Sequence, residues 1–433
     1  MVLSVNDLSF ISETVEENYD ISIYKIERNP LNGFLGDTYI INNKYVLKIP
    51  KRGGDEKKPQ GNVKFSTYVM NEAQLHGIHA PINIKTRNGE LYGFNKKLNY
   101  FHLMEKIHTN SEEENKISTR QLSFLLGYHS SIISLLTSNI TKAYKFKEKD
   151  YYDHWSLEAS ISKLKSFFGV EDNMNYLNST FVLEKAKENL GLFKHVPATL
   201  RDQIEHRDPI RILELAKEIK NKKNRNTRKF VIHSDIKPEN LLFGYNNSTK
   251  MPEVQGSFDY TFSCLANPAK NIANTIVDSF IGITRDYKIN YEEILEIAKG
   301  VLFVFQLNKE EIFSIEDEIL SACIRKYTLR WEYWKNELNG RYRDYDVPFI
   351  DPKEIYNITY SFKEEFSKNS LNQELFELSL GSPSSYIYLE LKEFLDSSQY
   401  WDIRMSDPKK LRIIVDSILK RSINTEEYNL ILM

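Results

Sequence analysis

The sequence predicts an α+β protein of two lobes, a small β-rich N-terminal lobe and a larger, mostly helical lobe with a helical C-terminal extension. Two observations predict this class. Short β-branched and aromatic runs crowd the N-terminal part of the chain, whereas patterns with helical spacing dominate from residue 119 onward. We expect the N-terminal lobe at 1–107, the second lobe at 108–345 and the extension at 346–433. A chain of 433 residues is long enough for roughly two or three such units.

The N-terminal lobe is predicted from short runs of strand-forming residues. These runs are Ile21–Ile26, Thr38–Ile41, Tyr45–Ile49, Leu91–Phe94 and Phe101–Met104. Asn42-Asn43-Lys44 is typical of a hairpin turn, because asparagine tolerates the positive φ that such turns need. A charged loop follows over 51–62, and residues 63–77 then carry a helical pattern.

The second lobe and the extension are predicted from helical periodicity. Over 119–136, the residues on one face are Leu122, Leu125, Leu126 and His129. Pro209 stands near a helix start, where its missing amide hydrogen is not needed. Further helices are expected over 291–305, 314–338 and 387–395.

Composition excludes several classes of protein. Lys plus Arg is 58 and Asp plus Glu is 60, so the net charge of −2 gives no general attraction to nucleic acid or to an anionic membrane. The two cysteines, Cys264 and Cys323, are too few for a disulfide scaffold or a Cys-based zinc cluster. No segment has the length and apolarity of a membrane span, and the N-terminus lacks the basic region of a signal peptide. We therefore expect a cytoplasmic protein.

The most informative segment is 231–243, a polar loop between apolar runs that contains His233, Asp235, Lys237 and Asn240. The spacing His-x-Asp-x-x-x-x-Asn is typical of phosphoryl transfer. There, an aspartate orients the attacking hydroxyl and accepts its proton, and an asparagine reaches Mg²⁺ through its amide oxygen. Lys237 can neutralise the moving phosphoryl group, and His233 is interpreted as a packing residue. The alternative is that Asp235 and Asn240 are turn residues that cap a helix.

Two further segments supply charged groups for the same chemistry. The apolar run before Asp259 delivers a carboxylate that would complete an Mg²⁺ site with Asn240. Upstream, Lys48 lies in a predicted strand and would bind the α- and β-phosphates of a nucleotide. Glu72, on the following helix, is expected to pair with Lys48; the alternative is a solvated helix residue.

Two glycines precede Lys48 in the predicted hairpin. Gly33 and Gly36 can let the backbone approach a phosphate, although a plain hairpin turn explains them equally well. The pattern is sparser than a full Gly-x-Gly-x-x-Gly loop.

These motifs together resemble the aminoglycoside phosphotransferase and choline kinase family, part of the wider protein-kinase-like fold. The residues that carry the resemblance are His233–Leu242, Phe258–Tyr260 and Asn267–Ala273, in an order that spans roughly residues 30 to 280. The third stretch resembles the family's Asp-Pro-x-x-Asp-hydrophobic-Ala segment, with asparagine at 267 and 271. Leu103–Ile107 resembles the hinge that holds adenine. Lys237 departs from the family, where many members have histidine.

The resemblance implies an ATP- or GTP-dependent kinase that uses Mg²⁺. The residues it implies are Asp235 for catalysis; Asn240 and Asp259 for the metal; and Lys48, Glu72, Glu105 and Ile107 for the nucleotide. The motifs themselves add Lys237 for catalysis and Gly33 and Gly36 for the nucleotide. The backbone groups of Glu105 and Ile107 would bind adenine.

The acceptor stays open at this stage. A small-molecule hydroxyl (aminoglycoside, amino alcohol or sugar-like) is expected. A Ser/Thr kinase acting on a peptide or protein, for example in a peptide-modification pathway, is the alternative that Lys237 and the basic run 220–229 favour. That run is interpreted as a solvated loop or a docking site, and not as a nucleic-acid site, because no aromatic residues interleave it. A nucleotide-binding pseudokinase scaffold is the third hypothesis. The sequence predicts no oligomeric state.

Overall fold

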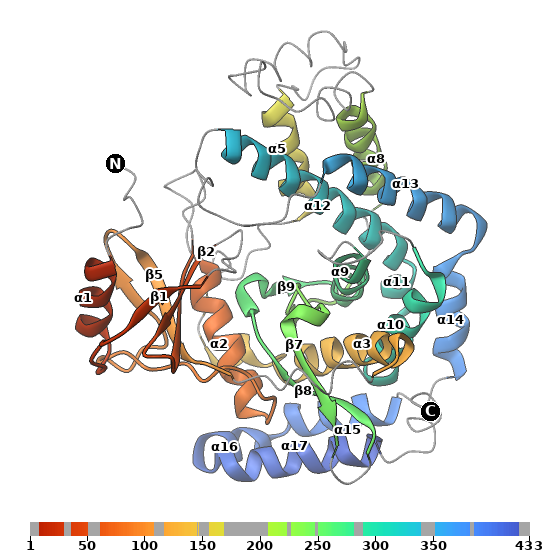
Figure 1. The fold of residues 1–433 in the computed structure, drawn as a ribbon. Helices are drawn as coiled ribbons and strands as arrows, with labels where there is room; N and C mark the ends of the chain where they lie inside the picture. The colour runs from red at the N-terminus through yellow and green to blue at the C-terminus, as the bar shows by residue number, and fades with distance from the viewer. Residues whose placement is uncertain are drawn as a thin grey trace.

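The computed structural model describes residues 8–29, 36–50, 61–107, 117–144, 146, 156–168, 207–222, 227–246, 250–280, 289–338, 351–381 and 385–423. Figure 1 shows a small lobe built on a twisted sheet and a larger lobe made mostly of helices. This matches the predicted α+β class. Within the described residues, none of the helices combines the length and the apolarity needed to cross a bilayer.

The small lobe contains an antiparallel sheet in the order β1-β2-β3-β5-β4. Its strands are β1 (Ile26–Arg28), β2 (Gly36–Ile41), β3 (Tyr45–Pro50), β4 (Gly93–Asn95) and β5 (Asn99–Glu105). The predicted turn between β2 and β3 is confirmed, because Asn42 and Asn43 have φ values of 53° and 57°. Register places Lys48 opposite Thr38 on one side and His102 on the other, in the middle of the sheet.

The predicted strand over Ile21–Ile26 is wrong except at its last residue, where β1 begins. Side chains satisfy the backbone amides of this segment in place of a neighbouring strand. The Glu16 carboxylate accepts from the amide of Ile23 at 2.6 Å, and the Asn42 side chain accepts from the amides of Tyr24 and Lys25, each at 3.1 Å.

Two helices flank this sheet (Figure 1). Helix α1 (Leu8–Asn18), which the sequence analysis did not predict, buries Ile11 and Val15 against sheet residues such as Tyr39 and Phe101. Helix α2 (Gly61–Leu75) lies on the other side and confirms the helical pattern expected over 63–77. Its apolar residues join the core of the larger lobe rather than that of the sheet, so α2 connects the two lobes.

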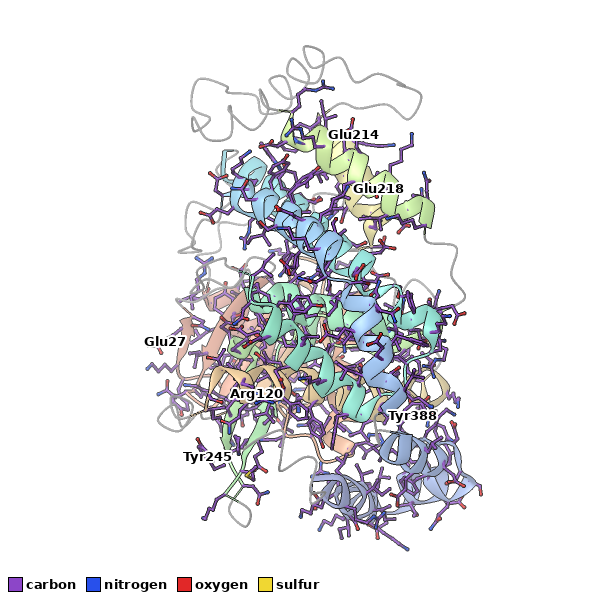
Figure 2. The ribbon with its side chains drawn as sticks, turned by 90° about the vertical axis from the view of Figure 1, so that its right-hand side faces the viewer. Glu27, Arg120, Glu214, Glu218, Tyr245 and Tyr388 are labelled. Carbon is purple, nitrogen blue, oxygen red and sulfur yellow. The ribbon has the colours of Figure 1, made fainter. Side chains whose placement is uncertain are left out.

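The larger lobe is organised around α3 (Thr119–Leu136), α9 (Pro268–Phe280), α10 (Tyr291–Val304) and α12 (Ile315–Leu338), all close to their predicted bounds where these were given. Helices α3 and α10 cross so closely that only glycine fits at the contact. A Cβ on Gly127 would lie 1.8 Å from the carbonyl oxygen of Ile297. A Cβ on Gly300 would lie 2.1 Å from the carbonyl oxygen of Phe124. Arg120, labelled in Figure 2, adds an ion pair with Glu296 at 3.3 Å.

Shorter elements complete the larger lobe. The helices are α4 (Ile140–Ala143), α5 (Leu157–Phe168), α8 (Asp208–Lys222) and α11 (Lys309–Ile312). Two small antiparallel sheets of two strands each also belong to it. One pairs β6 (Phe230–Ile232) with β9 (Cys264–Ala266), and the other is a hairpin of β7 (Leu241–Tyr245) and β8 (Pro252–Ser257). Figure 2 shows Glu214 and Glu218 on α8, at the end of the molecule opposite residues 385–423.

The C-terminal extension consists of α13 (Pro352–Lys368), α14 (Leu371–Gly381), α15 (Ser385–Asp396), α16 (Ser398–Ser406) and α17 (Pro408–Ile423). Its buried residues belong to the same continuous hydrophobic cluster as those of the larger lobe. In Figure 1, α13 lies along α12, whereas α15, α16 and α17 lie together beneath α2 and α3. The extension therefore reaches both lobes.

Candidate active site

The loop 233–237 connects the two small sheets of the larger lobe. Strand β6 leads into it, and the single turn of 3-10 helix η4 (Pro238–Asn240) leads out of it into β7. Pro238 opens η4, where its fixed φ suits the first position of a helical turn. The backbone amide of Phe258 donates to the carbonyl of Asn240 at 3.0 Å. This bond ties the loop to the segment that carries Asp259.

Asp235, Lys237 and Asn240 meet at the end of this loop. Lys237 Nζ lies 3.2 Å from Asp235 Oδ2, and Asn240 Nδ2 donates to the Asp235 carbonyl and to Oδ2, each at 2.8 Å. Asp235 is only 5% exposed. Burial by itself would raise the pKa of Asp235, but the ammonium groups of Lys237 and then Lys326 outweigh it and hold this pKa below its usual value. Asp235 is therefore an ionised, oriented carboxylate at neutral pH.

Asp259 faces Lys48 across the boundary between the lobes. Lys48 Nζ lies 2.7 Å from Asp259 Oδ1, and the Thr261 hydroxyl donates to the same oxygen at 2.7 Å. Asp259 adopts the left-handed conformation (φ 60°, ψ 58°), which is costly for a residue other than glycine and is typical of functional sites. Burial opposes ionisation, yet Lys48 lowers the pKa of Asp259 far below its usual value.

The donor atoms of Asn240 and Asp259 fit a magnesium ion. Asn240 donates through Nδ2, so its carbonyl oxygen Oδ1 has no hydrogen-bond partner among the described residues. In Asp259, Oδ1 is occupied by Lys48 and Thr261, whereas Oδ2 has no such partner in the same set. One carboxylate oxygen and one amide oxygen are the hard ligands that Mg²⁺ takes from protein, with phosphates and water completing its shell.

The candidate catalytic loop, residues 233–237, packs on α9. Ser234 has a φ of 67°, and its hydroxyl accepts from Asn274 Nδ2 at 2.7 Å. The amide of Ser234 donates to Asn271 Oδ1 at 3.4 Å, and Asn271 Nδ2 donates to the Ser130 hydroxyl at 2.5 Å. An amide side chain can accept from the loop and donate to α3 at once, which a carboxylate at 271 could not do. This explains the asparagine where the resembling family has aspartate.

His233 has the packing role expected from the sequence. It is fully buried, its Nε2 lies 3.2 Å from the carbonyl of Phe258, and its ring packs on Tyr260 at 4.4 Å between centroids. Burial lowers the pKa of His233 to about 4. A neutral imidazole at this depth links the catalytic loop to the Asp259 segment and moves no proton near neutral pH.

The structure does not bring Lys48 and Glu72 together, so the predicted pair is absent. Lys48 pairs with Asp259, and Glu72 pairs instead with Arg404 of α16. The Tyr144 hydroxyl also donates to Glu72 Oε1 at 3.0 Å. Glu72 is 1% exposed, which excludes the alternative of a solvated helix residue. The sequence could not reveal this partner, because Arg404 lies in the extension.

The predicted hinge lies at the end of β5. The amide of Glu105 donates to the carbonyl of Ile82 at 2.8 Å, and the amide of Lys106 donates to the carbonyl of Lys44 at 2.8 Å. The amide of Ile107 has no acceptor among the described residues. Of the glycine positions, Gly36 opens β2, and Gly33 lies outside the described residues.

The basic run 220–229 is only partly described, because 223–226 lie outside the described residues. Arg228 is not a free docking cation. Its guanidinium binds the buried carboxylate of Glu311 through bonds of 2.8 and 2.5 Å and donates to Tyr388 at 3.1 Å (Figure 2 labels Tyr388). This part of the run is a structural attachment between β6, α11 and α15.

A second group of buried charges, which the sequence analysis did not identify, lies between α9 and α12. Lys326 of α12 pairs with Asp278 of α9, and Arg325 Nη2 approaches the same carboxylate at 3.6 Å. Lys326 is one of the cations that hold the pKa of Asp235 down. Its sequence neighbourhood carries no motif, so only the packing of α12 on α9 reveals it.

A cavity of about 270 Å³ lies next to this group, between α5, β9, α9 and α12. Its lining residues include Asn274, which contacts Ser234, and the charged residues Glu158, Lys270, Glu318 and Arg325. Its wall therefore carries charges of both signs and several hydrogen-bonding groups.

Comparison with known proteins places this site in a recognised fold. No protein-family model matches the sequence, and no curated protein sequence matches it. Solved structures do match. An amicoumacin kinase in complex with AMP-PNP, Ca²⁺ and Ami is 14% identical with a TM-score of 0.51, over 84% of this chain and 94% of that one.

Two more solved structures match over similar lengths. A microcompartment-associated aminopropanol kinase is 12% identical with a TM-score of 0.49, over 85% of this chain and 100% of that one. A spectinomycin phosphotransferase in complex with ADP is 15% identical with a TM-score of 0.47, over 82% of this chain and 98% of that one. The likeness to the amicoumacin kinase, which has the highest TM-score of the three, shows that the chain has a bilobal, protein-kinase-like fold of the aminoglycoside phosphotransferase type, as the sequence predicted.

Proposed function

We propose that the protein is a phosphotransferase that moves the γ-phosphate of ATP or GTP to a hydroxyl group of a small molecule, with Mg²⁺ as cofactor. The observation that carries this proposal is the buried carboxylate of Asp235, held by Lys237 and Asn240 beside the Lys48–Asp259 pair. A scaffold protein has no need of a buried carboxylate with this set of charged neighbours.

The nucleotide would lie between the lobes. The amide of Ile107, which has no acceptor among the described residues, and the carbonyl of Glu105 would supply the donor and the acceptor that adenine or guanine requires. Lys48 would exchange Asp259 for the nucleotide phosphates, which leaves Asp259 free to bind metal with Asn240. Mg²⁺ held there supplies positive charge against the phosphate oxygens.

Asp235 would orient the acceptor hydroxyl and accept its proton as the phosphoryl group transfers. Its lowered pKa makes it a hydrogen-bond acceptor at neutral pH, which suits positioning more than strong basicity. Lys237, at 3.2 Å, is placed to offset charge on the phosphoryl group and keeps Asp235 ionised. Positioning and charge stabilisation are the main sources of catalysis in this chemistry.

A small polar acceptor is favoured over a peptide. The structural neighbours act, by their names, on amicoumacin, aminopropanol and spectinomycin. The basic run that favoured a peptide substrate contributes at least Arg228 to internal packing instead.

The test is a screen for release of ADP or GDP with Mg²⁺ and a panel of hydroxyl-bearing amino alcohols, amino sugars, sugars and antibiotics, with a peptide pool as a separate arm. We expect at least one small molecule to stimulate release in the wild type and not in Asp235→Ala. Asp416→Ala is the matched control, because Asp416 is exposed and pairs only with Lys420 on α17 among the described residues. Stimulation by peptides alone, or equal release from Asp235→Ala, would overturn the proposal.

A further inference from the structure

A buried ion pair joins the C-terminal extension to the nucleotide lobe. Arg404 of α16 binds the carboxylate of Glu72 on α2, and both side chains are almost inaccessible to solvent, at 8% and 1% exposure. Glu72 is the only acidic residue of α2. A carboxylate at this depth needs a cationic partner, because an unpaired buried charge is strongly destabilising.

Aromatic residues surround this pair and fix its geometry. The Tyr144 hydroxyl donates to Glu72 at 3.0 Å and accepts from Arg404 at 3.2 Å, and the guanidinium lies 5.4 Å from the centre of the Tyr144 ring. Just past the end of α2, His76 Nε2 lies 3.1 Å from the hydroxyl of Tyr400, and the two rings are stacked. Thus α16 contacts both the last turn of α2 and the residue that follows the helix.

The same part of the extension is also attached to the larger lobe. Asn139, next to α4, donates to the carbonyl of Leu395 at 2.6 Å, and Lys142 pairs with Asp396 at 3.3 Å. Because α16 follows directly after these residues, the position of α2 is set by groups that belong to the larger lobe (Figure 1).

Glu72 therefore has one cationic partner in the structure, Arg404, and a different one, Lys48, in the arrangement expected of a kinase. In the structure Arg404 has Glu72, and Lys48 has Asp259. In kinase chemistry the strand lysine is held on the phosphates by the helix glutamate, while the aspartate binds metal. Binding of a nucleotide with Mg²⁺ therefore requires Lys48 to leave Asp259, and the pair that would then orient Lys48 is blocked by Arg404.

We propose that helices α15 to α17, residues 385–423, form an intramolecular latch that keeps the protein in a state of low nucleotide affinity by holding Glu72 on Arg404. This inference rests on the nucleotide site proposed above. When the latch opens, α2 can move and Glu72 can reach Lys48. The latch is a two-state element with a defined switch, the exchange of Arg404 for Lys48 as the partner of Glu72.

The test measures binding of a fluorescent ATP analogue with Mg²⁺, which needs no knowledge of the acceptor. Arg404→Met keeps much of the side-chain volume and removes the charge. If the competent state is populated at about one tenth in the wild type, this variant binds the analogue about tenfold more tightly. The double variant Glu72→Gln/Arg404→Met is expected to lose this gain, because the side chain at position 72 is then unable to hold Lys48.

Controls separate the latch from a purely structural role. Arg421→Met removes an arginine of the same extension that pairs with Glu390 at the surface, and its affinity is expected to equal that of the wild type. Tyr144→Phe removes the hydroxyl that contacts both Glu72 and Arg404, and it is expected to bind more tightly by about threefold, a partial release of the latch.

Equal or weaker binding by folded Arg404→Met overturns the latch. If Arg404→Met does not fold, the absence of a gain in Tyr144→Phe overturns it instead. A wild type that binds no nucleotide contradicts the proposed function itself, whereas normal wild-type binding with no gain in the variants contradicts only the latch.

Discussion

Replacing Asp235 by asparagine changes one charge in the site and little else. The new side chain keeps an acceptor oxygen for the amide of Asn240, which bonds to the Asp235 carboxylate at 2.8 Å in the wild type, and it fits the same buried volume. It cannot accept the proton of a hydroxyl, and it leaves Lys237 without the carboxylate at 3.2 Å. The fold should therefore survive while the chemistry does not.

The expected size of the effect follows from this role. Loss of a positioned base typically lowers the rate by about 10²- to 10⁴-fold, which corresponds to about 2.7 to 5.4 kcal/mol in the activation free energy. Nucleotide affinity should change by less than about threefold, because the proposed nucleotide and metal contacts come from Lys48, Asn240 and Asp259 instead.

The assay is acceptor-dependent ADP release at saturating MgATP, combined with titration calorimetry of MgATP on the same preparations. Asp416→Asn, which changes an exposed carboxylate on α17, is the matched control. A turnover of Asp235→Asn within about tenfold of the wild type would refute the assignment of Asp235 as the base. A loss of nucleotide binding equal to the loss of turnover would place Asp235 in the nucleotide site rather than at the acceptor.

Three further predictions concern the metal, pH and packing. Asp259→Asn should abolish the Mg²⁺ dependence of nucleotide affinity measured by calorimetry; an unchanged dependence would exclude Asp259 as a ligand. Burial lowers the pKa of His102, His129 and His233 to about 3, 3 and 4. The unfolded chain binds protons at these histidines first as pH falls below about 6.5. The free energy of unfolding should therefore be highest above that pH and should be lower by about 2 kcal/mol per histidine at about pH 5. Urea titrations with equal midpoints at about pH 7 and pH 5 would contradict this. Gly127→Ala should lower the free energy of unfolding by about 2 kcal/mol or more, because its Cβ would lie 1.8 Å from a backbone oxygen of α10; an unchanged urea midpoint would contradict this packing.

Much of the fold was predictable where the preferences of neighbouring residues favour the same structure as the packing of the folded chain. The asparagines at the tip of the β2–β3 turn adopt the positive φ that their residue type allows. The bounds of α3 follow from its apolar face, and Ser118 with Gln121 closes a capping box at its start. The catalytic loop was also predictable, since Asp235 and Asn240 are close in sequence and their spacing alone brings them together.

The rest depends on contacts between distant parts of the chain. Glu72 and Arg404 are 332 residues apart, so no local pattern links them. The segment before β1 has the composition of a strand, but Glu16 and Asn42 satisfy its amides and remove the need for a strand partner. Likewise, Lys326 lowers the pKa of Asp235 only because α12 packs on α9.

The most direct test of the central claim is a comparison of ADP release by the wild type and Asp235→Ala with MgATP, with and without the panel of hydroxyl-bearing small molecules. The phosphotransferase account predicts that at least one small molecule stimulates the wild type and that Asp235→Ala releases ADP at least about a hundredfold more slowly while still binding MgATP. Equal rates for the two proteins, or a wild type that binds no nucleotide, would contradict it.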